Sequence, residues 1–395
     1  MKITDIKTES LQLPFVEALT AAYGERTHST IVLVSIETDE GVTGYGESTG
    51  LFQQTAETFI HSELKPLLVG EDPTRIEYLV HKVEHLIDWN SFAAYPIAAI
   101  DTALHDLKGK VFGLPVYELL GGAYRTEIQF DGLIHLHSPQ VDAASAKRFV
   151  DLGYRTLKVK TGVDTLLDMK RLDAIRSAVG DDVRIRVDYN MALSPRTAVR
   201  TIEAISVFGI EYVEQPTPGW DIDGLAEVAR SVSVPIAADE SCQSVRDALR
   251  LAERHACEVF CVYISEAGGI VRAREIAAIA NAAGIACVLG TWGEGGVGFA
   301  AGIHLAAASR NFSLDQGTGY QVLAYDYVNL PFPIDERGGS VAIPTGPGLG
   351  VEPDRGKIAA NCTVVNTDAV FRAAPGGIPR LGQILPPAPT SGVQR

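Results

Sequence analysis

Residues 155–160 read Arg-Thr-Leu-Lys-Val-Lys, and the runs that follow end in carboxylates at regular intervals. These later runs, 183–188, 211–214 and 235–239, end in Asp188, Glu214 and Asp239. Counted from Lys160, the steps are 188 − 160 = 28, 214 − 188 = 26 and 239 − 214 = 25 residues. Each step is about the length of one strand–helix unit. The pattern predicts parallel strands whose charged carboxyl ends meet at one edge.

The same alternation continues on both sides of this stretch. Strand candidates begin near Ile128, Thr156, Val183, Glu211, Pro235, Val259, Ala286 and Phe312. Amphipathic helices lie between them, for example at 143–152, 166–179, 196–207 and 245–254. Eight such units predict an α/β fold with a closed (β/α)₈ TIM-type barrel. An open doubly wound sheet is the rival, but no glycine-rich phosphate loop follows the first strand.

The chain before the barrel has a different character. Residues 31–37 are apolar and β-branched, 39–41 form a turn signal, and 42–46 resume extended chain. Helical patterns then run from about residue 54 to 110, and Pro115 follows the last of them. We expect an α+β capping domain at 1–122 and the barrel at 123–330. Segment 331–395 should complete the cap and, after about residue 373, continue as an extended Pro/Gly-rich tail.

Composition excludes several classes of partner. Lys and Arg total 34 and Asp and Glu total 49, so the net charge is 34 − 49 = −15. This acidic balance argues against nucleic acid or an anionic membrane as a partner. No apolar run is long enough to span a membrane, and the first residues lack a signal peptide's apolar stretch. The five scattered cysteines are interpreted as reduced thiols in a cytoplasmic protein.

Three carboxylates at one mouth would repel each other strongly unless a cation lay between them. An all-oxygen site of this kind suits Mg²⁺, with Mn²⁺ as an alternative, and Asp188, Glu214 and Asp239 are the expected ligands. Asn190 and Glu240, which lie next to these strand ends, are secondary candidates. The competing interpretation is three unrelated surface acids at strand ends.

Lys158 and Lys160 alternate by two and therefore point to the same side of their strand. An inward lysine close to another cation and a metal ion is pushed toward its neutral form, which a general base requires. A Lys-x-Lys pair alone is usually solvated. The prediction of a catalytic base therefore depends on the position of this pair, one strand–helix unit before the first carboxylate.

These motifs resemble the enolase superfamily, in the mandelate racemase/muconate lactonizing enzyme branch and closer to the latter. The resemblance also covers 99–110, 113–115, 119–122 and Asp239-Glu240-Ser241, where the muconate lactonizing subgroup takes the Asp as third ligand. It implies a modified enolase-type barrel and Mg²⁺-dependent removal of the proton beside a substrate carboxylate, through an ene-diolate. It also implies a homo-oligomer whose cap, with Tyr23, Phe52 and Trp292, forms a partly apolar specificity pocket.

One position departs from the family pattern. The second lysine usual in this subgroup lies five residues before a Gly-Gly pair; here the pair is Gly268-Gly269, so the residue is 268 − 5 = 263, Tyr263. Tyr263 is either a packing residue or a weak acid on the opposite face of the substrate. Glu294 resembles the acidic residue after the seventh strand and could hydrogen-bond an enolised carboxylate.

The expected substrate is a small-molecule carboxylate, and several reactions remain open. A single base favours cycloisomerisation or β-elimination, such as dehydration of a hydroxy acid or sugar acid. Epimerisation is possible if Tyr263 is a second acid. The alternatives from other classes are a Schiff-base aldolase using Lys160 and a non-catalytic carboxylate-binding barrel.

Overall fold

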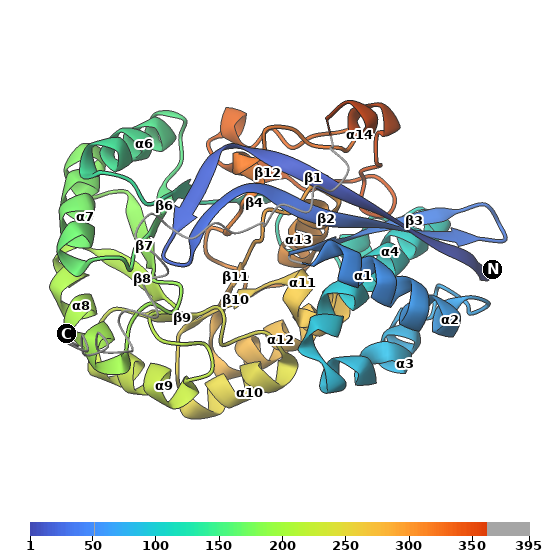
Figure 1. Ribbon diagram of the computed structural model, residues 1–395, viewed down its shortest axis with the longest axis horizontal. Helices are drawn as coiled ribbons and strands as arrows, with labels where there is room; N and C mark the ends of the chain where they lie inside the picture. The colour runs from blue at the N-terminus through green and yellow to red at the C-terminus, as the bar shows by residue number, and fades with distance from the viewer. Residues whose placement is uncertain (51, 362–395) are drawn as a thin grey trace, which may run out of the picture.

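The computed structural model describes residues 1–50 and 52–361. Within these residues, a three-stranded antiparallel sheet with helices lies beside a seven-stranded parallel sheet that is wrapped by helices (Figure 1). No described helix combines the length and the apolar character that crossing a membrane requires.

The N-terminal sheet has the order β1 (Ile3–Ala21), β2 (Gly24–Thr38) and β3 (Thr43–Thr49). The hairpin of β1 and β2 reaches across to the mouth of the barrel, so that its turn at Ala22 and Tyr23 lies over the strand ends (Figure 1). The helices of this part are α1 (Gln53–Phe59), a π-helix (Ile60–Leu64), α2 (Lys65–Leu68), α3 (Ile76–Trp89), a 3₁₀ turn (Ser91–Ala93), α4 (Ala94–Phe112) and α5 (Val116–Leu119).

Helix α4 joins the two parts of the molecule. Most of its residues are buried, because one side packs on the sheet and another on the barrel. Glycine is required where β3 meets it, since a Cβ on Gly46 would lie 1.9 Å from the backbone oxygen of Ala99. The contact packs β3 closely on α4.

The parallel sheet runs in chain order from β5 to β11. Its strands are β5 (Gly132–Ile134), β6 (Thr156–Lys160), β7 (Arg184–Asp188), β8 (Ile210–Glu214), β9 (Ile236–Ala238), β10 (Val259–Val262) and β11 (Ala286–Leu289). The helices around it are α6 (Pro139–Asp151), α7 (Thr165–Val179), α8 (Pro195–Ile205), α9 (Ile222–Ser231), α10 (Val245–Arg254), α11 (Ile264–Ala267), α12 (Ile270–Ala283) and α13 (Gly296–Ala308), with a 3₁₀ turn (Ser206–Phe208) after α8. The predicted (β/α)₈ barrel with an α+β cap is confirmed.

Two expected strands differ from the structure. Ile128 belongs to β4 (Glu127–Gln129), which pairs with β12 (Ser340–Ala342), and the first barrel strand is β5 instead. Where the eighth strand was expected, just after Phe312, the described chain forms an isolated bridge between Phe130 and Gln316 in place of a regular strand. The physical reason is that the side-chain Oε1 of Gln316 accepts from the Leu289 backbone nitrogen at 2.9 Å, where a strand would offer a carbonyl. The segment still closes the barrel without a regular ladder.

The described part of the C-terminal segment contacts both the cap and the barrel. It contains a 3₁₀ turn (Asp335–Arg337), β12 and α14 (Arg355–Asn361), and another 3₁₀ turn (Tyr320–Val322) precedes it. An isolated bridge joins Pro115 of the cap to Gly348, and β12 pairs with β4. The expected extended tail lies outside the described residues, and the division at residues 122 and 330 stays a prediction.

Candidate active site

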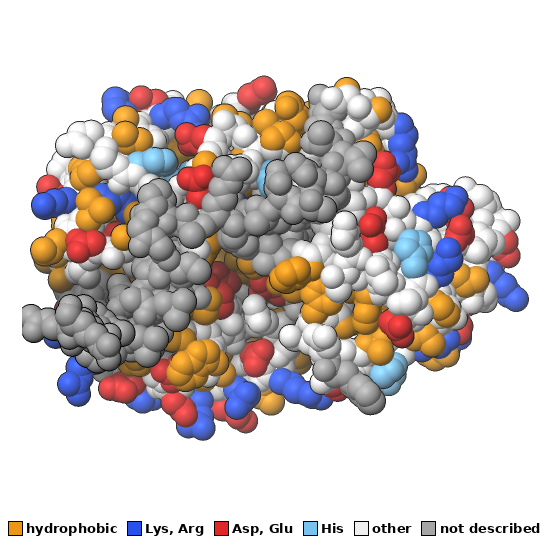
Figure 2. All heavy atoms as spheres, viewed as in Figure 1, with side chains coloured by type: hydrophobic (Ala, Val, Ile, Leu, Met, Phe, Trp, Pro, Cys, Tyr) orange, Lys and Arg blue, Asp and Glu red, His pale blue; other side chains and the backbone are white. Residues whose placement is uncertain are grey.

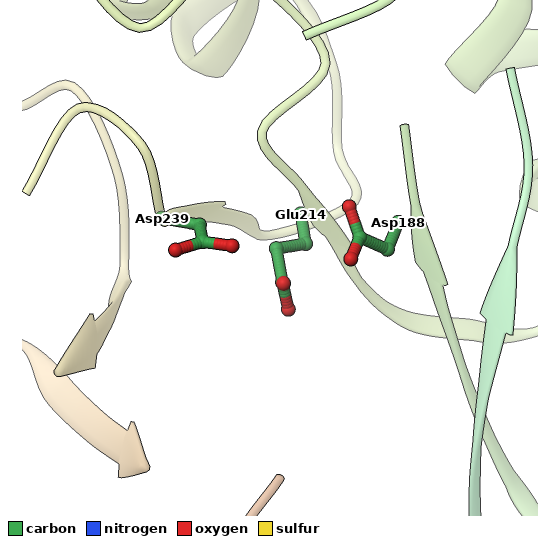
Figure 3. A group of neighbouring side chains, drawn as sticks. All are labelled: Asp188, Glu214 and Asp239. Carbon is green, nitrogen blue, oxygen red and sulfur yellow. The ribbon is translucent and has the colours of Figure 1, made fainter. Parts of the chain in front are cut away.

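Three neighbouring strands bring the predicted acidic residues together. Asp188 and Glu214 are the last residues of β7 and β8, and Asp239 follows β9 directly. Their side chains converge on one space at the strand ends (Figure 3), and one oxygen from each lies within 4.8 Å of the others. All three are buried, which rules out the interpretation as scattered surface acids.

The electrostatics of this group fit a divalent cation. Burial, together with Glu240 and Glu214, raises the pKa of Asp239 well above its usual range. In the part of the chain that the structure describes, Asp239 forms no ion pair, and Glu214 Oε2 accepts no hydrogen bond. A buried acid without a countercharge and a buried oxygen without a donor are both costly, and a bound cation would satisfy both. Asp188, Glu214 and Asp239, called the metal group below, could therefore hold a metal ion.

The two lysines of β6 face the same carboxylates. Lys158 Nζ donates to Glu214 and lies 3.3 Å from Asp188. Lys160 Nζ donates to Asp188 Oδ2 at 2.6 Å and to Asn190 Oδ1 at 3.1 Å. Although burial favours neutral Lys160, contact with Asp188 raises its pKa, opposite to the direction expected from the sequence. A neutral Lys160 therefore requires the charge of the carboxylates to be balanced.

Tyr263 lies across the barrel from Lys160. Counting the closing segment after Phe312 as the eighth position, β6 and β10 are four positions apart in either direction around the barrel. Tyr263 follows β10 and donates its hydroxyl to Asp239 Oδ2 at 3.2 Å. Its ring packs against Gly290, where a Cβ would lie 1.9 Å from the ring. The ring is thus held in place beside the metal group.

A cavity of about 640 Å³ opens above these side chains. Acidic side chains lie in a hollow near the centre of this face (Figure 2). Of the site residues predicted from the sequence, the cavity is lined by Tyr23, Lys158, Lys160, Asn190, Asp239, Glu240, Tyr263 and Trp292.

The structure does not bring Phe52 or Glu294 to this cavity. Phe52 is 65 % exposed and borders a second cavity of about 690 Å³, where its ring meets Phe92. The Glu294 carboxylate accepts from the Thr291 hydroxyl and the Trp292 backbone nitrogen, so it stabilises its own loop. Phe52 lies beyond the cavity because α1 begins directly after it and turns the chain away.

Several cavity residues were missed by the sequence reasoning. They include Arg26 of β2, Asp131 before β5, Gln243 after β9 and Glu266 of α11. Glu266 has a signal that could have been used, since it follows Tyr263 by one helical turn and so can lie on the same side. Arg26 and Asp131 reach the cavity only through the long hairpin and the displaced first strand.

The barrel, the cap and the acidic strand ends define an enzyme of the enolase superfamily. Residues 141–357 match the family model described as the enolase C-terminal domain-like domain. Residues 3–121 match the N-terminal domain of mandelate racemase and muconate lactonizing enzyme. The chain belongs to the mandelate racemase/muconate lactonizing enzyme family.

Its relatives are isomerases. The chain is 36% identical over 360 residues to the L-Ala-D/L-Glu epimerase of Clostridium acetobutylicum, covering 89% of this chain and 99% of the relative. It is 34% identical over 368 residues to muconate cycloisomerase 1 of Rhodococcus opacus, covering 89% and 96%. The crystal structure of the Pseudomonas fluorescens muconate lactonizing enzyme complexed with muconolactone matches with a TM-score of 0.87 at 31% identity, covering 92% and 99%. The chain is accordingly an isomerase of this type, which disfavours the aldolase and the non-catalytic alternatives.

Proposed function

We propose that this isomerase uses Mg²⁺ and a single base, Lys160, to remove the α-proton of a small-molecule carboxylate from one face. The proposal rests on one observation: the residue that lies across the barrel from Lys160 is a tyrosine, Tyr263, and not a second lysine. Mn²⁺ is the alternative metal. Asp188, Glu214 and Asp239 would hold the ion, which when bound would draw electron density from the substrate carboxylate and make the α-proton more acidic.

The neighbouring residues support this role for Lys160. Asn190 Oδ1 accepts one of its ammonium protons at 3.1 Å and so orients the nitrogen. Lys158 donates to Glu214 and lies two residues before Lys160 on β6, which is one layer deeper in the barrel. Its positive charge favours the binding of an anionic substrate. We expect Lys158 to bind and orient the carboxylate while Lys160 transfers the proton.

Tyr263 is proposed to act only as a proton donor. Burial, together with Asp239 and Glu266, raises the pKa of Tyr263 well above the ordinary value of about 10. The phenol is therefore protonated at neutral pH, so it can give a proton but rarely accept one. A base on one face and a donor on the other suit ring opening or closure, in which a bond β to the carboxylate breaks or forms. Elimination of a β-leaving group, as in a hydroxy-acid or sugar-acid dehydratase, shares this first step.

Epimerisation is the second candidate, because relatives of this chain are named as epimerases and a racemase. They include the L-Ala-D/L-Glu epimerase and the N-succinyl-L-Arg/Lys racemase of Bacillus cereus, the latter 32% identical. It would require Tyr263 to accept a proton as well as donate one. For either reaction we propose a cytoplasmic homo-oligomer acting on a small carboxylate.

The test is α-proton exchange in D₂O with Mg²⁺, followed by NMR for both enantiomers of each member of a carboxylate panel. We expect one enantiomer to exchange and its mirror image to exchange at least 10-fold more slowly. Lys160→Ala should abolish exchange, while Lys147→Ala, on an exposed lysine paired with Asp151, should leave it intact. Equal exchange of both enantiomers, lost for one of them in Tyr263→Phe, would refute the one-base proposal and favour the epimerase.

A further inference from the structure

We infer that Glu266 binds a positively charged nitrogen of the substrate, so that the substrate is an ammonium carboxylate. The inference rests on the proposed function, because it takes the carboxylate end of the substrate to lie at the metal group. It adds the chemical nature of the other end of the molecule.

Glu266 stands in the wall between two cavities. It belongs to α11, one turn after Tyr263, and borders both the 640 Å³ cavity and the second cavity. Its Oε1 accepts from Trp292 Nε1 at 2.7 Å and from the Tyr95 hydroxyl at 3.3 Å. Burial raises the pKa of Glu266 to about 7, while the donors Trp292, Gln243 and Tyr95 favour its ionised form. The carboxylate is thus held rigidly at the cavity surface.

Every partner of Glu266 is neutral. An indole, a phenol and an amide hydrogen-bond a carboxylate without cancelling its charge. Among the residues that the structure describes, Glu266 forms no ion pair. The two arginines that border the second cavity are already engaged, Arg246 with Asp88 at 2.9 Å and Arg272 with Glu84 and Glu275. A buried carboxylate without a countercharge is costly, and a cationic ligand removes that cost.

The other charges that face the cavity are accounted for differently. Asp131 pairs with the buried Arg186 at 3.2 Å. The guanidinium of Arg26 lies 5.5 Å from the centres of both the Phe15 and the Trp292 rings. Glu240 follows Asp239 directly, and its Oε1 accepts from Asn190 Nδ2 at 3.3 Å beside the proposed metal ligands. Glu266 is therefore the lining acid that lies away from those ligands and forms no ion pair among the described residues.

The surroundings of Glu266 suit an ammonium group in particular. The rings of Tyr263 and Trp292 lie side by side, with centroids 6.5 Å apart. Aromatic faces beside a carboxylate attract an organic cation through its charge and its apolar substituents. Because Glu266 is on the Tyr263 side, the cation should extend from the α-carbon away from Lys160.

The first test measures binding without catalysis. Saturation-transfer NMR in excess Mg²⁺ compares propylammonium with its neutral counterpart propionamide. We expect the ammonium probe to bind wild type at least 10-fold more tightly, and this preference to disappear in Glu266→Gln. Asp88→Asn, an exposed acid at the second cavity, is the matched control and should keep the preference. Equal binding of both probes to wild type, or a preference that survives Glu266→Gln, would overturn the inference.

The second test uses the exchange assay with amino acids and dipeptides, each beside its N-acetylated counterpart. Wild type should exchange the ammonium members at least 10-fold faster, and Glu266→Gln should bring this ratio close to one. Acetylated members that exchange equally well would overturn the inference while leaving the proposed function intact. If no member of any carboxylate panel exchanges, the proposed function fails and the binding test alone decides the role of Glu266.

A second variant is used if Glu266→Gln does not fold. Glu266→Asp, which withdraws the carboxylate by one methylene, should weaken propylammonium binding. Unchanged binding in this variant would also overturn the inference.

Discussion

The ligand oxygens of the metal group are not equivalent. Lys160 donates to Asp188, whereas the Tyr263 hydroxyl, at 3.2 Å, is the one side-chain donor to Asp239 among the described residues. Lys160 is thus placed to stabilise the ionised Asp188 without a metal ion, and Asp239 depends on a cation for the same purpose. Two neighbouring carboxylates of the same residue type therefore contribute differently to folding and to metal binding.

This difference predicts opposite effects of Asp239→Asn on two measurements. Without metal, the substitution removes a buried uncompensated acid, so the melting temperature should rise or stay unchanged. Mg²⁺ affinity, measured by titration calorimetry, should fall at least 10-fold, which corresponds to about 1.4 kcal/mol. Asp151→Asn, on an exposed acid paired with Lys147, is the control for both measurements. Unchanged Mg²⁺ affinity in Asp239→Asn would remove Asp239 from the metal site.

At the scale of secondary structure, one buried arginine holds the ends of two barrel strands. Arg171 of α7 donates to the backbone oxygens of Lys160 at 2.7 Å and of His135 at 2.9 Å. Its charge is balanced by Asp142 and by Asp168, the latter at 3.2 Å. The helix thereby ties the carboxyl ends of β5 and β6 together behind the proposed base.

Arg171→Met should therefore destabilise the fold and misplace Lys160. Removing one partner of a buried charge network costs about 3–5 kcal/mol, and urea unfolding would measure it. Arg184→Met, on a half-exposed arginine of β7, should cost about 1 kcal/mol or less. In the folded fraction of Arg171→Met, the exchange rate at saturating substrate should fall while Mg²⁺ affinity stays within a few-fold. A loss of stability without a fall in this rate would show that Arg171 does not position Lys160.

The secondary structure also shows where periodicity stops being informative. The six strands from β6 to β11 lie where apolar runs of regular spacing predicted them. The first and last strands of the barrel do not lie where the pattern predicted them. Ile128 pairs with β12, and Gln316 accepts a hydrogen bond through its side chain where a regular strand would pair through its backbone. Both exceptions depend on residues far away in the chain, which a local pattern does not reveal.

At the scale of the whole molecule, Glu47 links the cap to the barrel. It lies in β3 and accepts from the backbone nitrogens of Gly295 and Gly298, at the start of α13, at 2.8 and 2.9 Å. The Tyr327 hydroxyl donates to it at 2.6 Å. A carboxylate at a helix N-terminus is favourable, yet burial raises the pKa of Glu47 from 4.5 to about 7.

This shift predicts a pH-dependent stability. The folded state holds the Glu47 proton more tightly than the unfolded state, so its contribution is complete below about pH 4.5 and is lost as pH rises to about 7. Relative to Glu47→Gln, wild type should lose on the order of 3 kcal/mol of unfolding free energy across this window. Urea unfolding at pH 5 and pH 8 measures it, with Glu37→Gln, on a partly exposed acid paired with Lys7, as control. A constant difference between the two pH values would mean that the Gly295, Gly298 and Tyr327 donors keep Glu47 ionised throughout.

The sequence by itself determined the barrel, the capping domain, the acidic strand ends and the Lys-x-Lys strand. It could do so because side chains alternate along a strand and parallel strands end at one edge, so position in the repeat sets position in the barrel. Tyr263 was identified differently, through the family resemblance, because it occupies the place of the subgroup's usual second lysine five residues before Gly268-Gly269.

Only the tertiary structure decided which residues surround the acidic strand ends and the two lysines. Phe52 and Glu294 turn away from the cavity, while Arg26, Asp131 and Glu266 enter it. Their directions depend on how the cap packs on the barrel and on which donors each loop offers, which involve residues distant in sequence. The charge left on Glu266 is of this kind, since only the folded chain shows that its three partners are neutral.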